Sequence, residues 1–312
     1  MTFDPGRLDA LLAARTPTVA CDDPGSGCTI WLKLEYQLPS GSTKDRLAAH
    51  VLARAVAAGR VHEGTTVVEA SSGSTSIAFA MACAALGVRF VAVLPEGVSN
   101  ERLLIIRRYG GDWALVPAEG GMPGAIAETE RLAAADPDVF LPRQFTNPDN
   151  AAAHELRTGP ELLEALDQAG AQLDGFVAAV GTAGTLMGVG RAVRRARPSA
   201  VVARVVVAGE TLDAEQGGPA CLGIPGVLDC LSGLLDEAEL GGHPALAVPR
   251  SEAMDAAREL ARRGFPVGPS SGLNLAGARA LARELGPGHH IATVACDRME
   301  RYFSTDLFDD LR

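Results

Sequence analysis

Lysine is nearly absent from this sequence. Of the 28 basic residues in a chain of 312, only two are lysine, Lys33 and Lys44, and arginine supplies the rest. Arginine stays protonated at any workable pH, whereas a lysine amine can lose its proton and form a Schiff base with a carbonyl group. The chain nevertheless keeps Lys44 within Pro39–Arg46, which indicates that a reactive amine is needed at this position. The alternative is an ordinary solvated lysine in a loop.

Blocks of basic residues, CxxC pairs and zinc-like spacings of cysteine and histidine are absent too. The net charge of −10 argues against nucleic acid or an anionic membrane as a partner. The six cysteines form no metal-binding pattern with the six histidines, so no metal site is expected. Cys83 and Cys296 lie in apolar runs and are predicted to be small core residues.

Long apolar runs of the kind that cross a membrane are missing as well. The most apolar stretch, Ile77–Leu94, is broken by Gly87 and Arg89, which predicts a buried helix followed by a strand. The first residues, Met1–Arg15, carry acidic side chains and lack the apolar centre of a secretory signal. We therefore expect a cytoplasmic protein with reduced thiols and no membrane partner.

The chain does contain a regular alternation of short apolar strands and amphipathic helices from Thr29 onward. Eight strands are predicted, at residues 30–34, 65–69, 90–94, 113–116, 139–142, 175–180, 204–208 and 291–295. Such alternation predicts parallel βαβ units with covered sheets, so the expected fold class is α/β with two doubly wound domains. Asn147 and Pro148 interrupt the pattern. The expected division is a smaller, mobile domain at 40–145 and a larger one from 1–39 and 146–312.

Three predicted strand-to-helix junctions are rich in glycine, serine and threonine: Glu69–Ser76, Gly181–Thr185 and Gly268–Gly272. Ligands of parallel sheets bind at the carboxyl ends of the strands, so the three junctions are expected to face one crevice. Backbone N–H groups and two hydroxyls in Gly181–Thr185 favour a phosphate, while a tight turn with a threonine cap is the alternative. Glu69–Ser76 could hold a carboxylate or only cap its helix.

The lysine and the three junctions together indicate one function more strongly than each does alone. An unusual lysine, a phosphate loop, a carboxylate loop and the pair Ser270 and Ser271 are what a phosphorylated carbonyl cofactor needs when it condenses with lysine and accepts an amino acid. That cofactor is pyridoxal 5′-phosphate.

Ordered segments of the chain also match known motifs. Lys33–Arg46 is similar to K-x-E-x-x-N-P-x-G-S-x-K-D-R, Glu69–Ser76 to T-S-G-N-T-G, and Gly181–Thr185 to G-T-G-G-T. The series continues with Gln144–Asn150, Thr158–Glu161, Gly268–Gly272 and Asp297–Thr305. On these segments the chain resembles the cysteine synthase and cystathionine β-synthase family of pyridoxal-phosphate enzymes, known as fold type II. The resemblance implies two α/β domains with the cofactor in the cleft between them, and a homodimer.

The resemblance also implies a role for each loop. Lys44 would hold the cofactor as an aldimine and shuttle the substrate's α-proton as general base and acid. Ser270 would face the pyridine nitrogen and leave the ring a weaker electron sink than an aspartate would, which suits β-elimination to an aminoacrylate. Cofactor contacts are expected from Lys44, Ser74, Gly181, Thr182, Ala183, Gly184, Thr185 and Ser270. The substrate carboxylate is expected at Ser71, Ser72, Gly73, Thr75 and Gln144.

Four departures from the family pattern bear on specificity. Ser74 replaces an asparagine that lies near the cofactor's 3′-oxygen, and Leu38 replaces another asparagine. Ala183 replaces a glycine, which is tolerable if its φ is negative. Residues 217–226 replace the loop I-Q-G-I-G-A-G-F, which lines the entrance for the nucleophile. The sequence therefore leaves the second substrate open.

The leading expectation is β-replacement on an activated L-serine, with sulfide or a small amine as the nucleophile, as in cysteine or 2,3-diaminopropionate synthesis. O-acetyl-L-serine is favoured over O-phospho-L-serine because no arginine lies between Glu210 and Pro249. The alternative is a β-elimination lyase such as a cysteine desulfhydrase, a branch that Ser74 resembles. A non-enzyme that docks a partner's C-terminal peptide in its cleft is a third reading.

Overall fold

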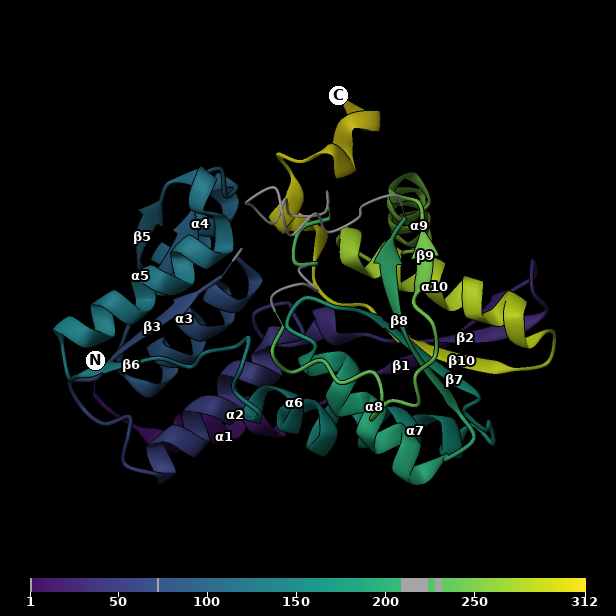
Figure 1. Cartoon of the computed structure of the whole chain (residues 1–312), viewed down its shortest axis with the longest axis horizontal. Helices are drawn as coiled ribbons and strands as arrows, with labels where there is room; N and C mark the ends of the chain where they lie inside the picture. The colour runs from purple at the N-terminus through teal and green to yellow at the C-terminus, as the bar shows by residue number, and fades with distance from the viewer. Residues whose placement is uncertain (1, 72, 209–223, 228–231) are drawn as a thin grey trace.

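The computed structural model describes residues 2–71, 73–208, 224–227 and 232–312. Two sheets, each covered by helices, lie side by side in Figure 1. All strand pairs of these sheets are parallel except one at an edge. The α/β fold with mainly parallel sheets that the alternating pattern predicts is therefore confirmed.

The larger sheet has six strands in the order β1-β2-β10-β7-β8-β9. Their bounds are Thr18–Asp23 (β1), Cys28–Lys33 (β2), Gly175–Ala179 (β7), Val201–Val207 (β8), Leu246–Val248 (β9) and His290–Val294 (β10). Helices α9 and α10 pack on one face, and α7 and α8 pack on the other. These helices span Gly159–Gln168 (α7), Gly184–Ala196 (α8), Arg250–Arg262 (α9) and Pro269–Leu285 (α10).

Both faces of this sheet are buried, which explains why its inner strands are continuous apolar runs. In β7, Val177 packs in the cluster that contains α10, whereas Phe176 and Ala178 pack in the cluster that contains α8. Alternation of polar and apolar residues is therefore absent from inner strands. The two strands that the sequence did not predict, β1 and β9, lie at the sheet edges. β1 carries partly exposed aspartates and β9 has only three residues, so neither gives a strong apolar signal.

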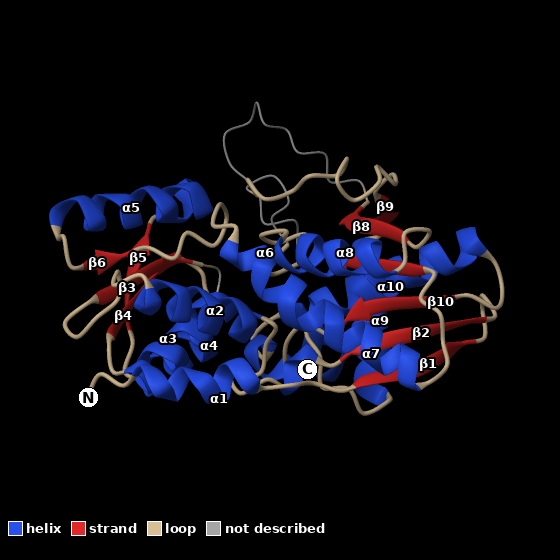
Figure 2. Cartoon of the chain, turned by 90° about the horizontal axis from the view of Figure 1, so that it is seen from below, coloured by secondary structure: helices blue, strands red, loops and turns tan. Residues whose placement is uncertain are grey.

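The smaller sheet has four parallel strands in the order β5-β4-β3-β6. They span Thr66–Ala70 (β3), Arg89–Pro95 (β4), Asp112–Val116 (β5) and Val139–Phe140 (β6). Helices Lys44–Ala57 (α2), Ser74–Leu86 (α3) and Asn100–Arg108 (α4) share a core with one face, and Gly121–Ala135 (α5) packs on the other. Figure 2 shows α5 separated from α2, α3 and α4 by the strands.

The N-terminal segment contacts the smaller sheet's layer of helices. Helix α1 spans Leu8–Ala13, and Leu8 is buried in the same cluster as α2 and α3. The backbone N–H of Asp4 also donates to the carbonyl of Leu86 at 2.9 Å. The prediction places residues 1–39 in the larger domain, whereas the first helix packs on the helices of the smaller sheet. Each sheet with its helices is called a unit below. The boundaries at 40 and 145 stay a prediction.

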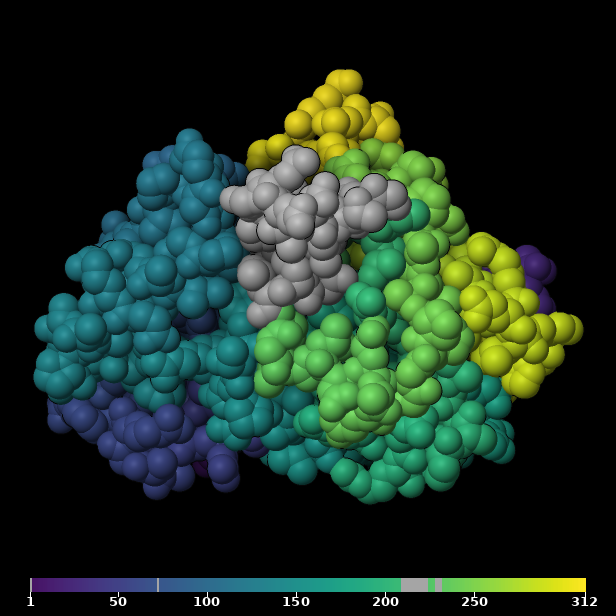
Figure 3. Space-filling view, viewed as in Figure 1, coloured from purple at the N-terminus to yellow at the C-terminus, as the bar shows by residue number. Residues whose placement is uncertain are grey.

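The C-terminal segment lies above the junction of the two units (Figures 1 and 3). After β10 it forms short 3₁₀ turns at Met299–Tyr302 and Asp306–Leu311. Ser99, beside α4, donates through its hydroxyl to the carbonyl of Arg301 at 3.3 Å, so this segment touches the smaller unit. Within the described ranges, no helix is long and apolar enough to cross a membrane.

Candidate active site

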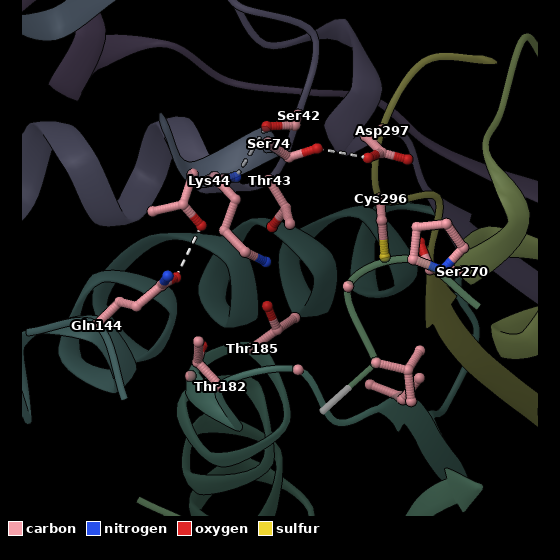
Figure 4. Close-up of a pocket in the computed structure, with 18 of the residues that line it drawn as sticks. Ser42, Thr43, Lys44, Ser74, Gln144, Thr182, Thr185, Ser270, Cys296 and Asp297 are labelled. Carbon is pink, nitrogen blue, oxygen red and sulfur yellow. Dashed lines mark hydrogen bonds between the residues drawn. The ribbon is translucent and has the colours of Figure 1, made fainter. Parts of the chain in front are cut away.

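One pocket collects side chains from both units (Figure 4). It lies where the junctions after β3, β7 and β10 meet the start of α2. Ten of the residues that the sequence singles out line it: Lys44, Ser74, Thr75, Gln144, Gly181, Thr182, Ala183, Gly184, Thr185 and Ser270. The expected convergence of separate loops on one crevice is therefore present in the structure.

Lys44 is the first residue of α2 and points into the middle of the pocket (Figure 4). The preceding turn is held by the backbone of the larger unit and positions this lysine. The backbone N–H of Thr43 donates to the carbonyl of Cys296 at 2.8 Å, and Ser42 forms an antiparallel β-bridge with Asp297. Gly41 has φ +85°, and a Cβ there would lie 2.7 Å from the Cδ of Arg298. The lysine is half-buried and has no ion pair with any described residue.

The loop Gly181–Thr185 ends at the N-terminus of α8, where N–H groups without helical partners favour an anion. Two glycines are required by close contacts rather than by dihedral angles. A Cβ on Gly181 would lie 2.3 Å from the carbonyl oxygen of Gly226, and one on Gly184 would lie 2.0 Å from Asn150 Oδ1. Ala183 has φ +64°, so the condition of a negative φ is not met, and this alanine adopts a conformation that favours glycine.

Both threonine hydroxyls of this loop are held by neighbouring side chains. Asn150 donates through Nδ2 to Thr182 Oγ1 at 2.8 Å and to the carbonyl of Gln144 at 2.8 Å. Thr185 Oγ1 lies 3.3 Å from Nε2 of the buried His154. Burial holds the pKa of His154 well below its usual value, so this imidazole is neutral. The loop therefore offers hydroxyls, helix-end N–H groups and no carboxylate, a donor set that fits a phosphate.

The loop after β3 contributes to a group of hydroxyl and amide side chains that suits the binding of a carboxylate. Thr75 Oγ1 donates to Gln144 Oε1 at 2.7 Å, and Gln144 Nε2 donates to the carbonyl of Ala70 at 2.6 Å. Ser71 instead accepts from the N–H groups of Gly73 and Ser76, at 2.9 and 3.3 Å, so its hydroxyl serves the loop itself. Ser71 and Gly73 are not among the described lining residues, and the prediction for Ser72 lies outside the described residues.

Glu69 supports this loop from the protein interior, a role that the sequence did not reveal. Its two carboxylate oxygens accept from the N–H groups of Ala70 and Gln144, at 2.9 and 3.1 Å. Burial raises the pKa of Glu69 to about 8. Glu69 thus fixes the backbone of Gln144, the residue that faces Thr75.

Ser74 and Asp297 connect the two units across the pocket. Ser74 Oγ donates to Asp297 Oδ2 at 2.8 Å (Figure 4), and the hydroxyl of Tyr302 donates to the same oxygen at 2.7 Å. Ser74 starts α3 in the smaller unit, whereas Asp297 follows β10 in the larger one. The shorter serine, where the family has asparagine, therefore makes an interdomain hydrogen bond.

The opposite wall carries Ser270, Asn274 and Cys296. Asn274 accepts from the N–H of Ala179 at 2.7 Å and donates to the carbonyl of Val294 at 2.8 Å, so it joins the ends of β7 and β10. The core assignment of Cys83 is confirmed. Cys296 packs against a core cluster but is only partly buried and also lines the pocket, so its assignment holds only in part. Burial raises the pKa of the Cys296 thiol to about 11, so it stays protonated. Asn274 and Cys296 were missed because only the fold brings them to the pocket.

The segment that departs from the family's entrance loop contributes to the same pocket. Pro225 and Gly226 of this segment line it, as does the adjacent Val227, whereas residues 217–223 of the departure lie outside the described residues. Arg102 of α4 also lines the pocket and was not singled out by sequence. No cluster of three metal-ligating side chains occurs within the part of the chain that is described.

Comparisons with known proteins identify the family of the chain. The family model described as "Pyridoxal-phosphate dependent enzyme" matches residues 10–297. A cysteine synthase of Staphylococcus aureus is 38% identical over 291 residues, which cover 90% of each chain. The crystal structure of an O-ureido-L-serine synthase superposes with a TM-score of 0.88 at 36% identity, covering 98% of this chain and 95% of that one. A hydrogen sulfide-producing enzyme from Fusobacterium nucleatum gives 0.86 at 33% identity, covering 98% and 92%.

Proposed function

The chain belongs to the family of pyridoxal-phosphate dependent enzymes, and from this premise we propose that it catalyses β-replacement on an activated L-serine. The observation that carries the proposal is the meeting of Lys44, the loop Gly181–Thr185 and the pair Thr75 and Gln144 in one pocket. This chemistry needs three parts from the protein: an amine, a loop that binds an anion, and neutral side chains that bind the substrate carboxylate.

The residues fit the cofactor as follows. Lys44 would hold its carbonyl carbon, the start of α8 with Thr182 and Thr185 would hold its phosphate, and Ser270 would face its pyridine nitrogen. When bound, pyridoxal phosphate supplies the electron sink that stabilises negative charge on the substrate's α-carbon. A neutral hydroxyl at Ser270 does not force the ring nitrogen to stay protonated, which favours loss of a β-substituent over long-lived carbanions.

The protein side of the reaction then follows from position. Thr75 and Gln144, with the backbone of the loop that Ser71 orders, would bind the substrate carboxylate. The Lys44 amine would remove the α-proton and return it after the nucleophile has added. The contact between Ser74 and Asp297 joins the units over the pocket and would limit the entry of water.

For the leaving group we propose acetate, with O-acetyl-L-serine preferred to O-phospho-L-serine. The support is the absence of arginine between Glu210 and Pro249, the stretch that contains the altered entrance loop. For the nucleophile, relatives named as cysteine synthase and O-ureido-L-serine synthase indicate either sulfide or a nitrogen or oxygen nucleophile. A cytoplasmic location and a homodimer stay predictions.

A β-elimination lyase is the second candidate. It is supported by Ser74, which replaces the family asparagine and turns to Asp297, and by a structural relative named as a hydrogen sulfide-producing enzyme. In this reaction water ends the sequence, so cysteine would give sulfide, ammonia and pyruvate.

One experiment separates the two candidates. The holoenzyme is incubated with O-acetyl-L-serine, with and without sulfide or a candidate amine, and with cysteine alone, while amino acid products and pyruvate are measured. The proposal predicts a replacement product that needs both substrates and little pyruvate without a nucleophile. Rapid pyruvate release from the serine ester or from cysteine, with no added nucleophile, would contradict it and support the lyase.

A further inference from the structure

Arg102 is a buried cation without an anionic partner among the described residues. Its side chain lines the pocket, the residue is only 7% exposed, and its Nε has no hydrogen-bond acceptor among the described residues. No described carboxylate forms an ion pair with it, although its backbone is fixed by a bond from its N–H to the carbonyl of Ser99 at 3.1 Å. A desolvated guanidinium is costly unless an anion compensates it, and none of the protein's described carboxylates does so.

The position of Arg102 is set by the loop proposed for the substrate carboxylate. A Cβ on Gly73 would lie 2.3 Å from the Cδ of Arg102 and 2.8 Å from its Nε, so the arginine stem packs directly on this glycine. Gly73 has φ +142°, which also favours glycine. On its other side the guanidinium lies over the ring of Tyr302, with Cζ 4.9 Å from the ring centroid. The charge is thus held beside the loop by packing and not by an ion pair.

The charges around the pocket leave this cation available. Within the described part of the chain, the ionisable side chains that line it are Lys44, Arg102, Cys296, Asp297 and Tyr302. Asp297 already accepts from Ser74 and Tyr302, and Lys44 is assigned to the cofactor. The residues proposed to touch the substrate carboxylate, Thr75 and Gln144, are neutral.

We propose that Arg102 is a specificity-determining residue, whose positive charge selects amino acids with a free α-carboxylate at the Gly73–Thr75 loop. The inference rests on the proposed function, since it concerns the first substrate of that reaction. It adds a charged contribution to a carboxylate site otherwise built from hydroxyls and amides. Over a few ångströms and away from bulk water, a positive charge has a large effect on the binding of a carboxylate.

The test compares two ligands that differ only in the carboxylate. L-Alanine and L-alaninamide are titrated into the holoenzyme, and binding is read from the absorbance of the bound cofactor. In Arg102→Met, which keeps the stem that packs on Gly73, the affinity for L-alanine falls by about tenfold or more, and that for L-alaninamide changes by less than about twofold. Arg102→Lys keeps the charge and retains most of the discrimination. Arg108→Met, at an exposed arginine of the same helix, is the matched control and changes neither affinity.

An equal loss for both ligands in Arg102→Met would mean that the arginine only packs the loop, and would overturn the inference. Unchanged affinities, or a shift of the cofactor's absorbance before any ligand is added, would overturn it as well. If Arg102→Met does not fold, Arg102→Gln is compared with Arg102→Lys under the same criteria. Because turnover is not measured, an enzyme that binds L-alanine selectively through Arg102 but converts no serine ester would contradict the proposed function only.

Discussion

The two lysines of this chain lie eleven positions apart and have opposite surroundings. Lys33 ends β2 and is fully buried, and its Nζ donates to Glu161 Oε2 at 2.8 Å and to the carbonyl of Thr16 at 2.5 Å. Lys44 lies half-buried in the pocket and has no ion pair with a described residue. Rarity of lysine therefore marks two different needs, one for a compact buried charge and one for an available amine.

The surroundings of Lys33 form a closed network of charges. Arg46 Nη2 lies 3.0 Å from Glu35 Oε1 and 2.7 Å from Glu161 Oε2, so two cations face two carboxylates. Thr16 and Thr43 give further hydrogen bonds to Glu35. In the pocket, by contrast, Lys44 and Arg102 are left without such partners in the described structure. The paired charges are buried within the fold, whereas the two pocket cations are the ones to which we assign ligands.

The largest expected effect follows from removing the pocket lysine. Lys44→Ala should abolish the lysine-linked absorbance of the cofactor and lower activity by at least about a thousandfold, because the Schiff base and the α-proton transfer both need this amine. Absorbance spectra and the replacement assay measure the two effects. The folded Lys33→Met variant should keep the lysine-linked absorbance of the cofactor. Retention of the lysine-linked band in Lys44→Ala would contradict the assignment.

Breaking the closed network should cost stability instead. Glu161→Ala leaves Lys33 and Arg46 buried with too few anions, so the free energy of unfolding should fall by about 3–5 kcal/mol. Denaturant unfolding of the holoenzyme measures this loss. The control is Glu164→Ala, which breaks an exposed pair with Arg15 and should change the free energy of unfolding by less than about 1 kcal/mol. Similar losses in both variants would show that the buried network has no special role.

Glu69, a buried carboxyl that forms no ion pair with a described residue, should make stability depend on pH. The pKa of Glu69 is raised by burial from 4.5 to about 8, so between these values the folded state keeps a proton that the unfolded state releases. This contribution is complete below pH 4.5 and is lost as the pH rises toward about 8, at about 1.4 kcal/mol per pH unit. Glu69→Gln removes the titration, so the wild-type profile from pH 5 to 8 should fall more steeply than the variant profile. Parallel profiles of stability against pH in the two proteins would contradict the raised pKa of Glu69.

The smallest effect is expected at the contact between the units. Ser74→Ala removes one hydrogen bond to Asp297, worth about 1 kcal/mol, so KM for the amino acid substrate should rise about fivefold while the cofactor's absorbance stays. Ser26→Ala removes a similar bond to Asp23 far from the pocket and should leave KM unchanged. A KM for Ser74→Ala that matches the wild type would exclude a role of this bond in substrate binding.

Local patterns were sufficient to predict most of the fold. Strands such as β7 and β4 are buried on both faces, so each appears as a short apolar run followed by a helix. Loops that follow such strands were also identified, because glycine and hydroxyl residues concentrate there. The edge strands β1 and β9 were missed, because β1 carries two aspartates and β9 has only three residues.

Residues that reach the pocket through the fold alone could not be found from the sequence. Arg102 lies within a helix of ordinary composition. Its approach to Gly73 depends on packing inside the smaller unit, and its approach to Tyr302 depends on how the two units meet. Cys296 was assigned to the core from its apolar neighbours, yet the end of β10 opens onto the pocket. The positive φ of Ala183 was likewise not predicted, because alanine ordinarily adopts a negative φ.

The most direct test of the central claim is to locate the cofactor on one of the two lysines. Borohydride reduction of the holoenzyme fixes the cofactor to the amine that holds it, and trypsin then cleaves after each unmodified lysine and arginine. The assignment to Lys44 predicts a labelled peptide Leu34–Arg46 with an uncleaved Lys44–Asp45 bond. A labelled peptide Thr16–Lys44, which would carry the group on Lys33, or the absence of any label, would contradict it.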